Sequence, residues 1–492
     1  MRTGTRGRDM KKLCKSILAT TMALTTVASL TVFAACDDEV VNAYEIAVEN
    51  GFVGSEQEWL DSLHGADGKD GADLSINDIY EAAKSQGYEG SFMQFLQDYL
   101  QLDVREDNDT EMIAQNVMSV VSVFCGFQKQ TTYQNKYPPF NETSATMVTA
   151  SGGSGVILQL NKNAGNAYIV TNYHVLYQSS SYTDSEDGIS QDIYVYPYGA
   201  RVGFTTGDNN GDGYKDADMG DATGDGIRAT FVGGAMDYDI AILKVEGSTY
   251  LKNSQVVEAK IGDSNSLEVG EKVYAIGNAN GEGIAVTSGN VSVDSEYITM
   301  SALDGRDENR DGLVDGVSYR VLRTDAAINH GNSGGALFDA QGELIGITNA
   351  KNVENETDNM GYALPITQVE YLIDNIMDNG GVLKRAMLGV LPKLNASSAV
   401  LENGTLKVVE EVVVTDITKG AAADGKLKYG DIVKSLSING GEEKIITRSF
   451  QINDLLLTVR KGDTVRIKVV RESVETVVEI VYNKDSYFVQ YN

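Results

Sequence analysis

Residues 329–337 read NHGNSGGAL, and this stretch is the most specific feature of the sequence. Ser333 stands between glycines, and the apolar run 336–338 follows it directly. Glycines on both sides of a serine let backbone N–H groups converge on one point, which is how an oxyanion is stabilised. Ser333 is therefore a candidate nucleophile. Because a hydroxyl group of ordinary pKa is a poor nucleophile, it needs a base within hydrogen-bond reach.

The chain contains only three histidines, so few residues could be that base. His174 closely follows residues 167–171, whose sequence AYIVT is typical of a strand. An imidazole titrates near neutral pH and can accept the proton of a hydroxyl group. His330 is too close in sequence to Ser333 for this role, and His64 lies in a glycine-rich segment far upstream. His174 is the expected base.

A carboxylate should complete the set, because a buried carboxylate fixes the tautomer of the imidazole and stabilises the imidazolium. Asp239 opens the apolar run 240–245, and Asp237 is a rival two residues earlier. With Asp239, the order along the chain is His174, Asp239, Ser333. This is the chymotrypsin order and differs from those of subtilisins and α/β-hydrolases.

The arrangement of the remaining sequence indicates a mainly β chain. From about residue 114 to residue 376, short strand-like runs alternate with Gly/Asn/Asp turns, which is typical of an all-β barrel or sandwich. A helix is expected over 366–378, and residues 386–492 form a mixed unit of strands and helices. The clearer strands are expected at 117–127, 155–160, 167–171, 193–196, 240–245, 272–276, 319–323 and 344–348.

Several motifs together resemble the HtrA/Deg family of trypsin-like serine proteases. They are GGSGVI at 152–157, TNYHV at 171–175, DIAILKV at 239–245, TDAAIN at 324–329, the serine stretch itself, GELIGI at 342–347 and GYALP at 361–365. The resemblance covers roughly residues 114–378. It implies a chymotrypsin-like double six-stranded β-barrel with the active site between the barrels.

The resemblance also implies a role for each site residue. Ser333 would be the nucleophile, His174 the general base and then acid, and Asp239 the orienting carboxylate, because the family pattern places it directly before the Ile-Ala pair. The N–H groups of Gly331 and Ser333 would form the oxyanion hole, and catalysis would need no cofactor. His330 is a departure, since many family members have Pro there. The segment 347–349 is expected in the wall of the pocket for the residue before the cleaved bond.

The C-terminal unit, residues 386–492, fits the same family because Met387-Leu388-Gly389-Val390 resembles the carboxylate-binding loop of α+β PDZ domains. Such a domain binds the C-terminal peptide of a partner as an added strand. A helix near 450–459 would form the other wall of the groove. The alternative is a structural β-module without a ligand.

The N-terminal part of the chain reads as an export signal followed by a spacer. Residues 1–35 have a basic start and an apolar stretch ending FAA, and Cys36 follows directly, which resembles the lipobox of bacterial lipoproteins. An ordinary signal or an uncleaved membrane anchor is the alternative. Residues 36–113 are acidic and contain a repeat of helical pattern at an offset of 36 residues, which predicts a small helical spacer. Residues 114–385 would then be the protease domain.

The chain has 40 Lys and Arg against 70 Asp and Glu, a formal net charge of −30. This balance argues against nucleic acid as a partner, because phosphate binding requires concentrated basic side chains. After removal of the signal and lipidation of Cys36, only Cys125 would remain, so no intramolecular disulfide is expected.

Two acidic inserts share the pattern D-x-N-x-D-G-x-x-D, which supplies alternating oxygen ligands and a glycine for a sharp bend, as Ca²⁺ requires. The alternative is a solvated acidic turn. The second insert lies just before a segment that resembles the regulatory loop of HtrA proteases, so Ca²⁺ is hypothesised to order this loop and promote the oxyanion hole. The candidate ligands are Asp208, Asn210, Asp212 and Asp216 in the first insert, and Asp307, Asn309, Asp311 and Asp315 in the second.

The sequence therefore predicts an ATP-independent serine endopeptidase that degrades unfolded or mislocalised proteins. It would be lipid-anchored on the extracytoplasmic face of the bacterial cytoplasmic membrane, and the family resemblance implies a homotrimer. A non-proteolytic chaperone or peptide-binding scaffold on the same fold is the alternative. A calcium-dependent adhesin with a vestigial protease fold is a third candidate.

Overall fold

The computed structural model describes residues 80, 83–85, 88, 109–134, 142–203, 205–207, 216–218, 224–349, 360–402 and 405–491. The chain divides into two units, Met1–Asp107 and Asn108–Asn492, and the second contains nearly all of the described residues. The predicted signal, Cys36, His64 and nearly all of the helical repeat lie outside the described residues. So do Asp208, Asn210 and Asp212 of the first acidic insert.

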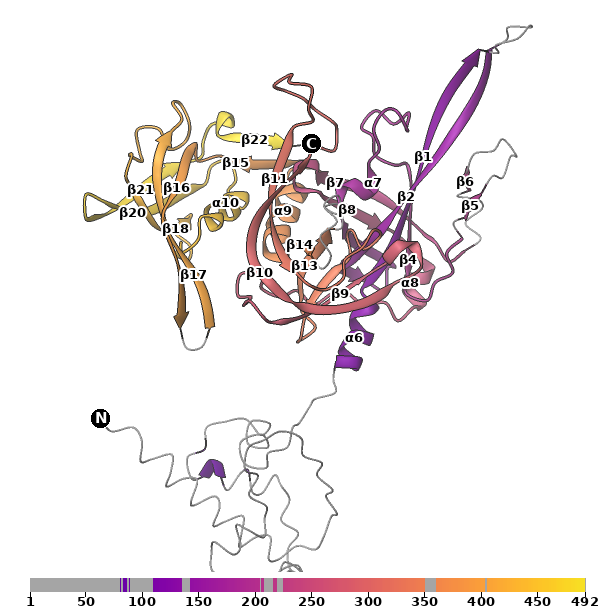
Figure 1. Ribbon diagram of the computed structural model, residues 1–492, viewed down its shortest axis with the longest axis horizontal. Coiled ribbons are helices and arrows are strands. Elements are labelled where there is room, and N and C mark those ends of the chain that lie inside the picture. Colours follow the sequence, from indigo (N-terminus) through magenta and orange to yellow (C-terminus); the bar gives the residue numbers. More distant parts are fainter. Residues whose placement is uncertain are drawn as a thin grey trace, which may run out of the picture. The chain divides into compact units, whose positions relative to one another are not determined.

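Two closed six-stranded barrels form the centre of the second unit (Figure 1). The first barrel has the strand order β1-β2-β3-β8-β7-β4, and the second has the order β10-β11-β14-β13-β12-β9. This confirms the predicted chymotrypsin-like double β-barrel. The strands of the first barrel are β1 (Val120–Gln134), β2 (Glu142–Asn161), β3 (Asn166–Thr171), β4 (Asp192–Pro197), β7 (Ile227–Ala235) and β8 (Ile240–Val245). Those of the second are β9 (Lys272–Gly277), β10 (Ala285–Ser301), β11 (Gly316–Thr324), β12 (Ala336–Asp339), β13 (Leu344–Asn349) and β14 (Gly361–Pro365).

Strands β3 and β8 of the first barrel pack against a core on each face, which explains why they are apolar runs without alternation. Ile169 and Leu243 belong to the core inside the barrel. Their neighbours Val170 and Ile242 face outward and join a second core that includes α9 (Ile366–Asp378). The buried positions of α9 recur every three or four residues, as expected of a helix with one apolar face. The helix predicted over 366–378 is confirmed.

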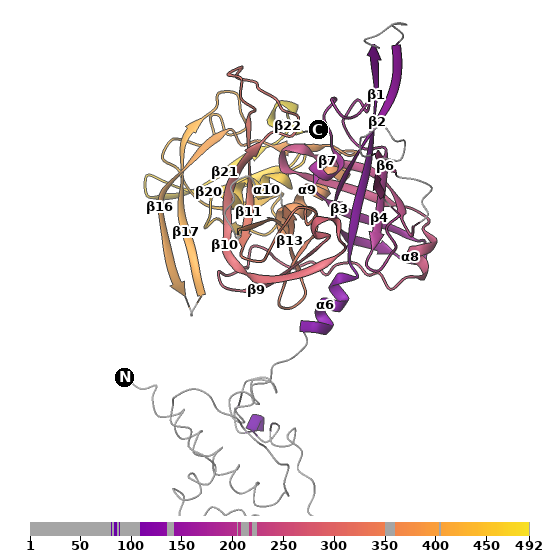
Figure 2. The ribbon, with the colours of Figure 1, turned by 45° about the vertical axis from the view of Figure 1, so that its right-hand side comes forward.

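The start of the first barrel differs from the sequence prediction. The strand expected from residue 117 begins at Val120, and it is preceded by α6 (Asp109–Val117). Two acidic side chains in the first turn of α6 favour a helix start there. The Asp109 carboxylate also accepts hydrogen bonds from Lys272 and Tyr274, each 2.5 Å long, which tie the helix to β9. At its other end, β1 continues with β2 as a long hairpin beyond the barrel (Figure 2).

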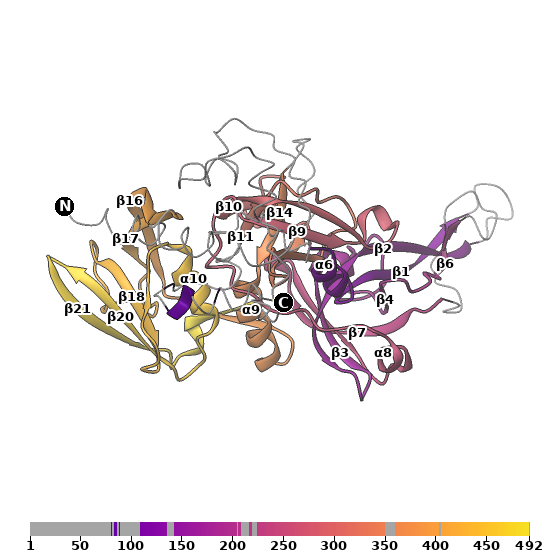
Figure 3. The same cartoon turned by 90° about the horizontal axis from the view of Figure 1, so that it is seen from below.

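The C-terminal part of the unit is a sheet with the path β16-β17-β18-β20-β21, flanked by α10 (Phe450–Leu457). Figure 3 shows α9 and α10 between this sheet and the barrels. The helix predicted near 450–459 is therefore present, and it ends at Leu457. The strands of this part are β15 (Leu383–Ala386), β16 (Val390–Glu402), β17 (Thr405–Ile417), β18 (Ile432–Ile438), β19 (Lys444–Ile445), β20 (Thr464–Arg471), β21 (Val474–Val481) and β22 (Phe488–Tyr491). The two strands not yet named, β5 (Thr205–Gly207) and β6 (Asp216–Asp218), pair with each other in a separate sheet.

A buried ion pair joins the C-terminal part to the second barrel. The Arg320 guanidinium of β11 donates to the Asp454 carboxylate of α10 over 2.7 Å, and the two side chains are 1% and 4% exposed. Gln368 of α9 donates to the other Asp454 oxygen over 2.8 Å. The Arg320 guanidinium also lies 4.0 Å from the centre of the Phe450 ring. Both charges are thus paired, and three elements from different parts of the chain meet at this pair.

Replacing Asp454 by alanine is expected to lower the free energy of unfolding by about 3–5 kcal/mol, because it leaves the buried charge of Arg320 without a partner. Urea unfolding followed by circular dichroism measures the loss. Glu479→Ala is the matched control: the Arg466–Glu479 pair is half exposed, so the loss should stay below about 1 kcal/mol. Equal losses in the two variants would contradict this account of the ion pair.

Candidate active site

His174 and Asp239 are in direct contact. His174 lies in the short helix α7 (Tyr173–Leu176), shortly after β3 ends, and Asp239 lies between the turn η1 (Met236–Tyr238) and β8. The Nδ1 atom of His174 is 2.7 Å from Oδ2 of Asp239, and the backbone N–H of His174 donates to Oδ1 over 2.9 Å. A carboxylate beside Nδ1 holds the proton there and leaves Nε2 as the proton acceptor.

Asn349 of β13 also bonds to the Asp239 carboxylate, a contact that the sequence did not predict. Its Nδ2 atom donates to Oδ2 of Asp239 over 3.0 Å, and both side chains are buried. The side chain of Tyr319 in β11 hydrogen-bonds to Asn349. Burial, together with the charge of Asp239, raises the pKa of Tyr319, so its hydroxyl group stays protonated. The second barrel thus helps to hold a carboxylate that belongs to the first.

Asp237, the rival carboxylate, bonds to a different residue. Its Oδ1 atom accepts a hydrogen bond of 2.7 Å from Arg306, which lies in the second acidic insert between β10 and β11. Asp237 therefore ties that insert to η1, and Asp239 is the carboxylate that contacts His174. The left-handed backbone of Asp239, with a φ of 52°, turns the chain at the point where β8 begins.

The loop around Ser333 is fixed through its carbonyl oxygens. The His330 carbonyl accepts from the Asn280 N–H (2.6 Å), and the Gly331 carbonyl accepts from the Ser154 hydroxyl (2.7 Å). The Asn332 carbonyl accepts from the Thr348 hydroxyl (2.5 Å), and the Ser333 carbonyl from the Ser154 N–H (2.7 Å). In a trans peptide the N–H points away from the C=O. Bonds to the carbonyls before Gly331 and Ser333 therefore turn the N–H groups of these two residues to the opposite side.

Two glycines of this loop are required by its packing. Gly331 has a φ of 89°, and a Cβ atom there would lie 2.2 Å from the Asn278 carbonyl oxygen. Gly334 has a φ of 83°, and its Cβ atom would lie 2.2 Å from the Ser154 carbonyl oxygen and 2.3 Å from the Thr171 hydroxyl. Thr171 ends the strand that leads to His174. The serine loop therefore packs directly against the segment that carries the histidine.

Two further positions were singled out in the sequence near this site: His330 and the segment 347–349. His330 is exposed, and its ring forms no hydrogen bond with any described residue. The prediction that 347–349 line a pocket for the substrate is not supported for their side chains, because Ile347, Thr348 and Asn349 are 0%, 0% and 2% exposed. Thr348 and Asn349 instead bond to the serine loop and to Asp239. The sequence places these polar side chains next to one another but does not show that they point inward.

The predicted carboxylate-binding loop, residues 387–390, leads into β16 at the edge of the C-terminal sheet. The Met387 N–H donates to the Tyr487 carbonyl, and the carbonyls of Leu388 and Gly389 accept from Ala423 and Thr418. The N–H groups of Leu388 and Gly389 have no acceptor among the described residues. An edge strand next to such a loop can accept an added strand.

The second acidic insert forms a turn that is held by its own carboxylates. Asp307 accepts from the N–H groups of Asp311 and Gly312, and Asp315 accepts from the N–H of Glu308. Asn309 accepts a second bond from the Asp311 N–H. Within the described part of the chain, no three His, Cys, Asp or Glu side chains are grouped as a metal ion would require.

None of the helices formed by the described residues has the length and apolar character needed to cross a bilayer. The predicted membrane contact depends on Cys36, which lies outside the described residues.

Comparison of the sequence with known proteins finds similarity to serine proteases. Residues 153–347 match the model of the trypsin-like peptidase domain. The serine protease Do-like HtrA of Lactococcus lactis subsp. cremoris (strain MG1363) is 28% identical over 386 residues, which are 75% of this chain and 81% of the relative. The protein of the same name from Bacillus subtilis (strain 168) is 30% identical over 337 residues, 66% of this chain and 62% of the relative.

Two further similar proteins carry related descriptions. The periplasmic pH-dependent serine endoprotease DegQ of Escherichia coli (strain K12) is 28% identical over 330 residues, 67% of this chain and 58% of the relative. Among solved structures, the HtrA-type protease AlgW with decapeptide has a TM-score of 0.45 and 24% sequence identity. The match covers 76% of this chain and 97% of the chain in that structure.

Proposed function

Because this chain is a trypsin-like serine endopeptidase related to the HtrA/Deg proteases, we propose that His174, Asp239 and Ser333 are its catalytic triad. The observation that carries the proposal is the contact between the His174 ring and the buried Asp239 carboxylate. The ring is held with a proton on Nδ1, so Nε2 accepts the proton of the Ser333 hydroxyl as its oxygen attacks the peptide carbonyl.

The N–H groups of Gly331 and Ser333 form the oxyanion hole of this triad. They are held on one side of the loop by the hydrogen bonds that the preceding carbonyls accept from Asn280 and Thr348. As the tetrahedral intermediate forms, its oxygen gains negative charge, and these donors stabilise that charge. The imidazolium of His174 then protonates the leaving amine, and water releases the acyl group from Ser333 by the reverse sequence of proton transfers. Protein groups supply every step, so catalysis requires no cofactor.

The substrates are unfolded or mislocalised proteins of the cell envelope, degraded without ATP. Residues 114–385 are the protease domain and residues 386–492 a PDZ domain that binds the C-terminal peptide of a substrate. The open edge of β16 and the N–H groups of Leu388 and Gly389 support this assignment, and Met387 and Val390 flank them.

The enzyme is a lipoprotein attached through Cys36 to the extracytoplasmic face of the cytoplasmic membrane. Residues 36–113 are its spacer, and it acts as a homotrimer.

Calcium binding remains a prediction for both acidic inserts. In the second insert the hydrogen bonds of Asp307 and Asp315 order the turn, and Arg306 connects it to Asp237 beside the triad. A cation bound at this insert would order a loop that already contacts η1. Asp208, Asn210 and Asp212 lie outside the described residues, and only the backbone of Asp216 is described, as the first residue of β6 (Asp216–Asp218).

A fluorophosphonate label read by mass spectrometry tests the triad in the full chain. An activated Ser333 reacts with the label at its hydroxyl group, and no other serine of the chain should react at a comparable rate. Denatured casein should be digested by the same preparation, and pretreatment with the label should stop digestion. A chain that binds denatured casein but neither reacts nor digests it would be the non-proteolytic scaffold.

Asn349→Ala is expected to lower kcat/KM by about 10- to 100-fold, because a hydrogen bond to a charged group contributes about 1.5–3 kcal/mol. The loss should fall on kcat with little change in KM, since Asn349 contacts Asp239 and touches no substrate. Asn349→Asp keeps the shape but removes the donor, so it should be at least as damaging. Asn349→Ser retains a donor and should recover part of the rate. If kcat/KM of the Asn349 variants fell only in step with their melting temperatures, this positioning role would be contradicted.

A further inference from the structure

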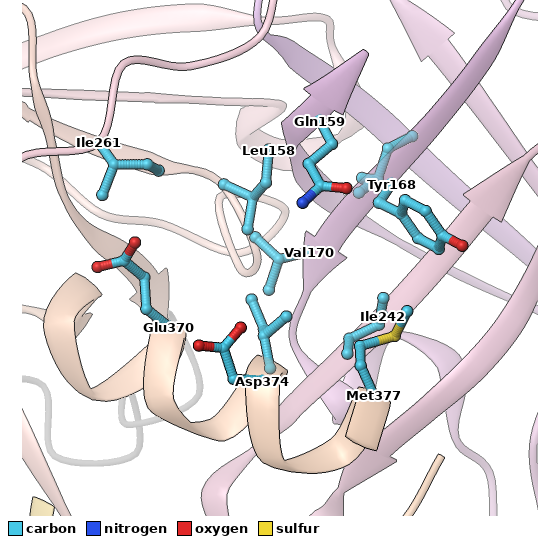
Figure 4. A pocket seen from close by; sticks show the side chains of 11 residues that line it. Leu158, Gln159, Tyr168, Val170, Ile242, Ile261, Glu370, Asp374 and Met377 are labelled. Carbon is cyan, nitrogen blue, oxygen red and sulfur yellow. The ribbon is translucent and has the colours of Figure 1, made fainter. Parts of the chain in front are cut away.

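A cavity of about 320 Å³ lies on the outer side of the first barrel, beneath α9 (Figure 4). Its floor is formed by outward-facing apolar side chains of β2, β3 and β8, among them Leu158, Val170 and Ile242. Ile261, together with Ile373 and Met377 of α9, adds to the apolar part of the lining. Val170 and Ile242 point away from the interior of the first barrel, and none of the residues that line the cavity belongs to the proposed triad.

Two carboxylates of α9, Glu370 and Asp374, border this apolar cavity. They are one helical turn apart on the same face of the helix, and Figure 4 shows both pointing toward the space between α9 and the strands. Glu370 is half-buried and Asp374 is exposed at the rim. Neither carboxylate forms a hydrogen bond or an ion pair with a described residue. The helix therefore holds two like charges over an apolar floor without compensation.

The surroundings do not supply a counter-charge. Lys244, whose Nζ lies 5.9 Å from the centre of the Tyr168 ring beside the cavity, pairs with Glu246 over 2.6 Å. Lys260, next to Ile261, pairs with Glu343 over 2.6 Å. Burial and then the neighbouring charges of Asp374 and Asp263 raise the pKa of Glu370. The ionised form of Glu370 is thus disfavoured in the empty cavity, and a bound cation would remove that cost.

We propose that this cavity is a binding site for an organic cation with an apolar body. The positive group would lie between Glu370 and Asp374, and the body would pack on Val170, Leu158 and Ile242. This chemistry is shared by the lysine side chain of a polypeptide and by a free alkyl- or arylalkylamine. A bare metal ion would leave the apolar floor unused, and an anion would be repelled by both carboxylates. The inference is independent of the proposed proteolytic function.

The test uses the full chain with Ser333→Ala, labelled with ¹³C at its methionine methyl groups. The Met377 signal, assigned with Met377→Leu, reports binding at the cavity. Titration with 4-phenylbutylammonium should move this signal to saturation, whereas 4-phenylbutan-1-ol, which has the same apolar body without charge, should bind about tenfold or more weakly, equivalent to about 1.4 kcal/mol. A third titration, with Nα-acetyl-lysine N-methylamide, is followed by the same Met377 signal. Saturable binding of the lysine amide indicates a polypeptide ligand, and binding of the arylalkylamine alone indicates a free amine.

The double variant Glu370→Gln/Asp374→Asn should remove the preference for the amine over the alcohol. The control Glu186→Gln/Glu475→Gln removes the same two charges at exposed positions and should keep the preference. Equal binding of amine and alcohol, a preference that survives in the double variant, or no saturable shift of Met377 would each overturn the proposal. Fluorophosphonate labelling of the double variant with Ser333 restored should equal that of wild type, which separates this site from the proposed triad.

Discussion

Replacing Ser333 by alanine is expected to reduce kcat for peptide hydrolysis by about a millionfold, the size of loss seen when the nucleophile of a serine protease is removed. The variant should fold normally. The hydroxyl group contributes the reacting atom, whereas the loop is held by the carbonyl bonds to Asn280, Ser154 and Thr348. Hydrolysis of a fluorogenic peptide, with denatured casein as a second substrate, measures the loss.

The double variant Ser333→Ala/His174→Ala should be no slower than either single variant, because residues that act as one unit are strongly non-additive. His330→Ala is the matched control for the histidine. It lies close to Ser333 in sequence, but its ring is exposed and forms no hydrogen bond with any described residue, so the rate should change only a few-fold. A large loss in His330→Ala with little loss in His174→Ala would mean that the base has been misassigned.

Asp239→Asn is expected to lower kcat by about 10⁴-fold, because an amide at this position stabilises the wrong tautomer of the histidine. In this chain the change also replaces an acceptor of three donors: the His174 ring, the His174 N–H and the Asn349 amide. One amide oxygen cannot accept from all three, so the ring would lose its fixed orientation. The rate of fluorophosphonate labelling should fall together with kcat.

Asp237→Asn provides the matched control, two residues away in the same segment. Its bond to Arg306 is partly exposed, so the loss of stability should be at most about 1 kcal/mol and kcat should stay within a few-fold of wild type. If Asp237→Asn were the more damaging of the two changes, the rival carboxylate would be the functional one.

The residues of the proposed triad could be singled out from the sequence because each lies at the end of a recognisable strand or in a glycine-flanked turn. His174 follows a strand and Asp239 precedes one, and both strands are apolar runs that can be recognised locally in the sequence. The strand pattern indicated only an all-β barrel or sandwich, and the family resemblance implied the double barrel. The helix α9 was predicted at about its observed bounds, and its buried positions recur every three or four residues.

The contacts that hold the site could not be predicted in this way. Asn349 bonds to a residue 110 positions earlier, and Arg306 bonds to one 69 positions earlier, so no local pattern records either contact. The error at the start of β1 has a different cause. An apolar run from Val117 looks like one strand, but the acidic first turn and the ties of Asp109 to β9 make its beginning a helix.

The buried pair of Arg320 and Asp454 limits how this protein can be recombined with its relatives. A chimera that joins these barrels at residue 385 to a C-terminal domain with no carboxylate at the position of Asp454 would leave the buried guanidinium of Arg320 unpaired. Such a hybrid would start with the penalty of a solitary buried guanidinium, even if both halves came from stable parents. Recombination with similar proteases should therefore keep Arg320, Gln368 and Asp454 together, although the first and the last are 134 positions apart in the sequence.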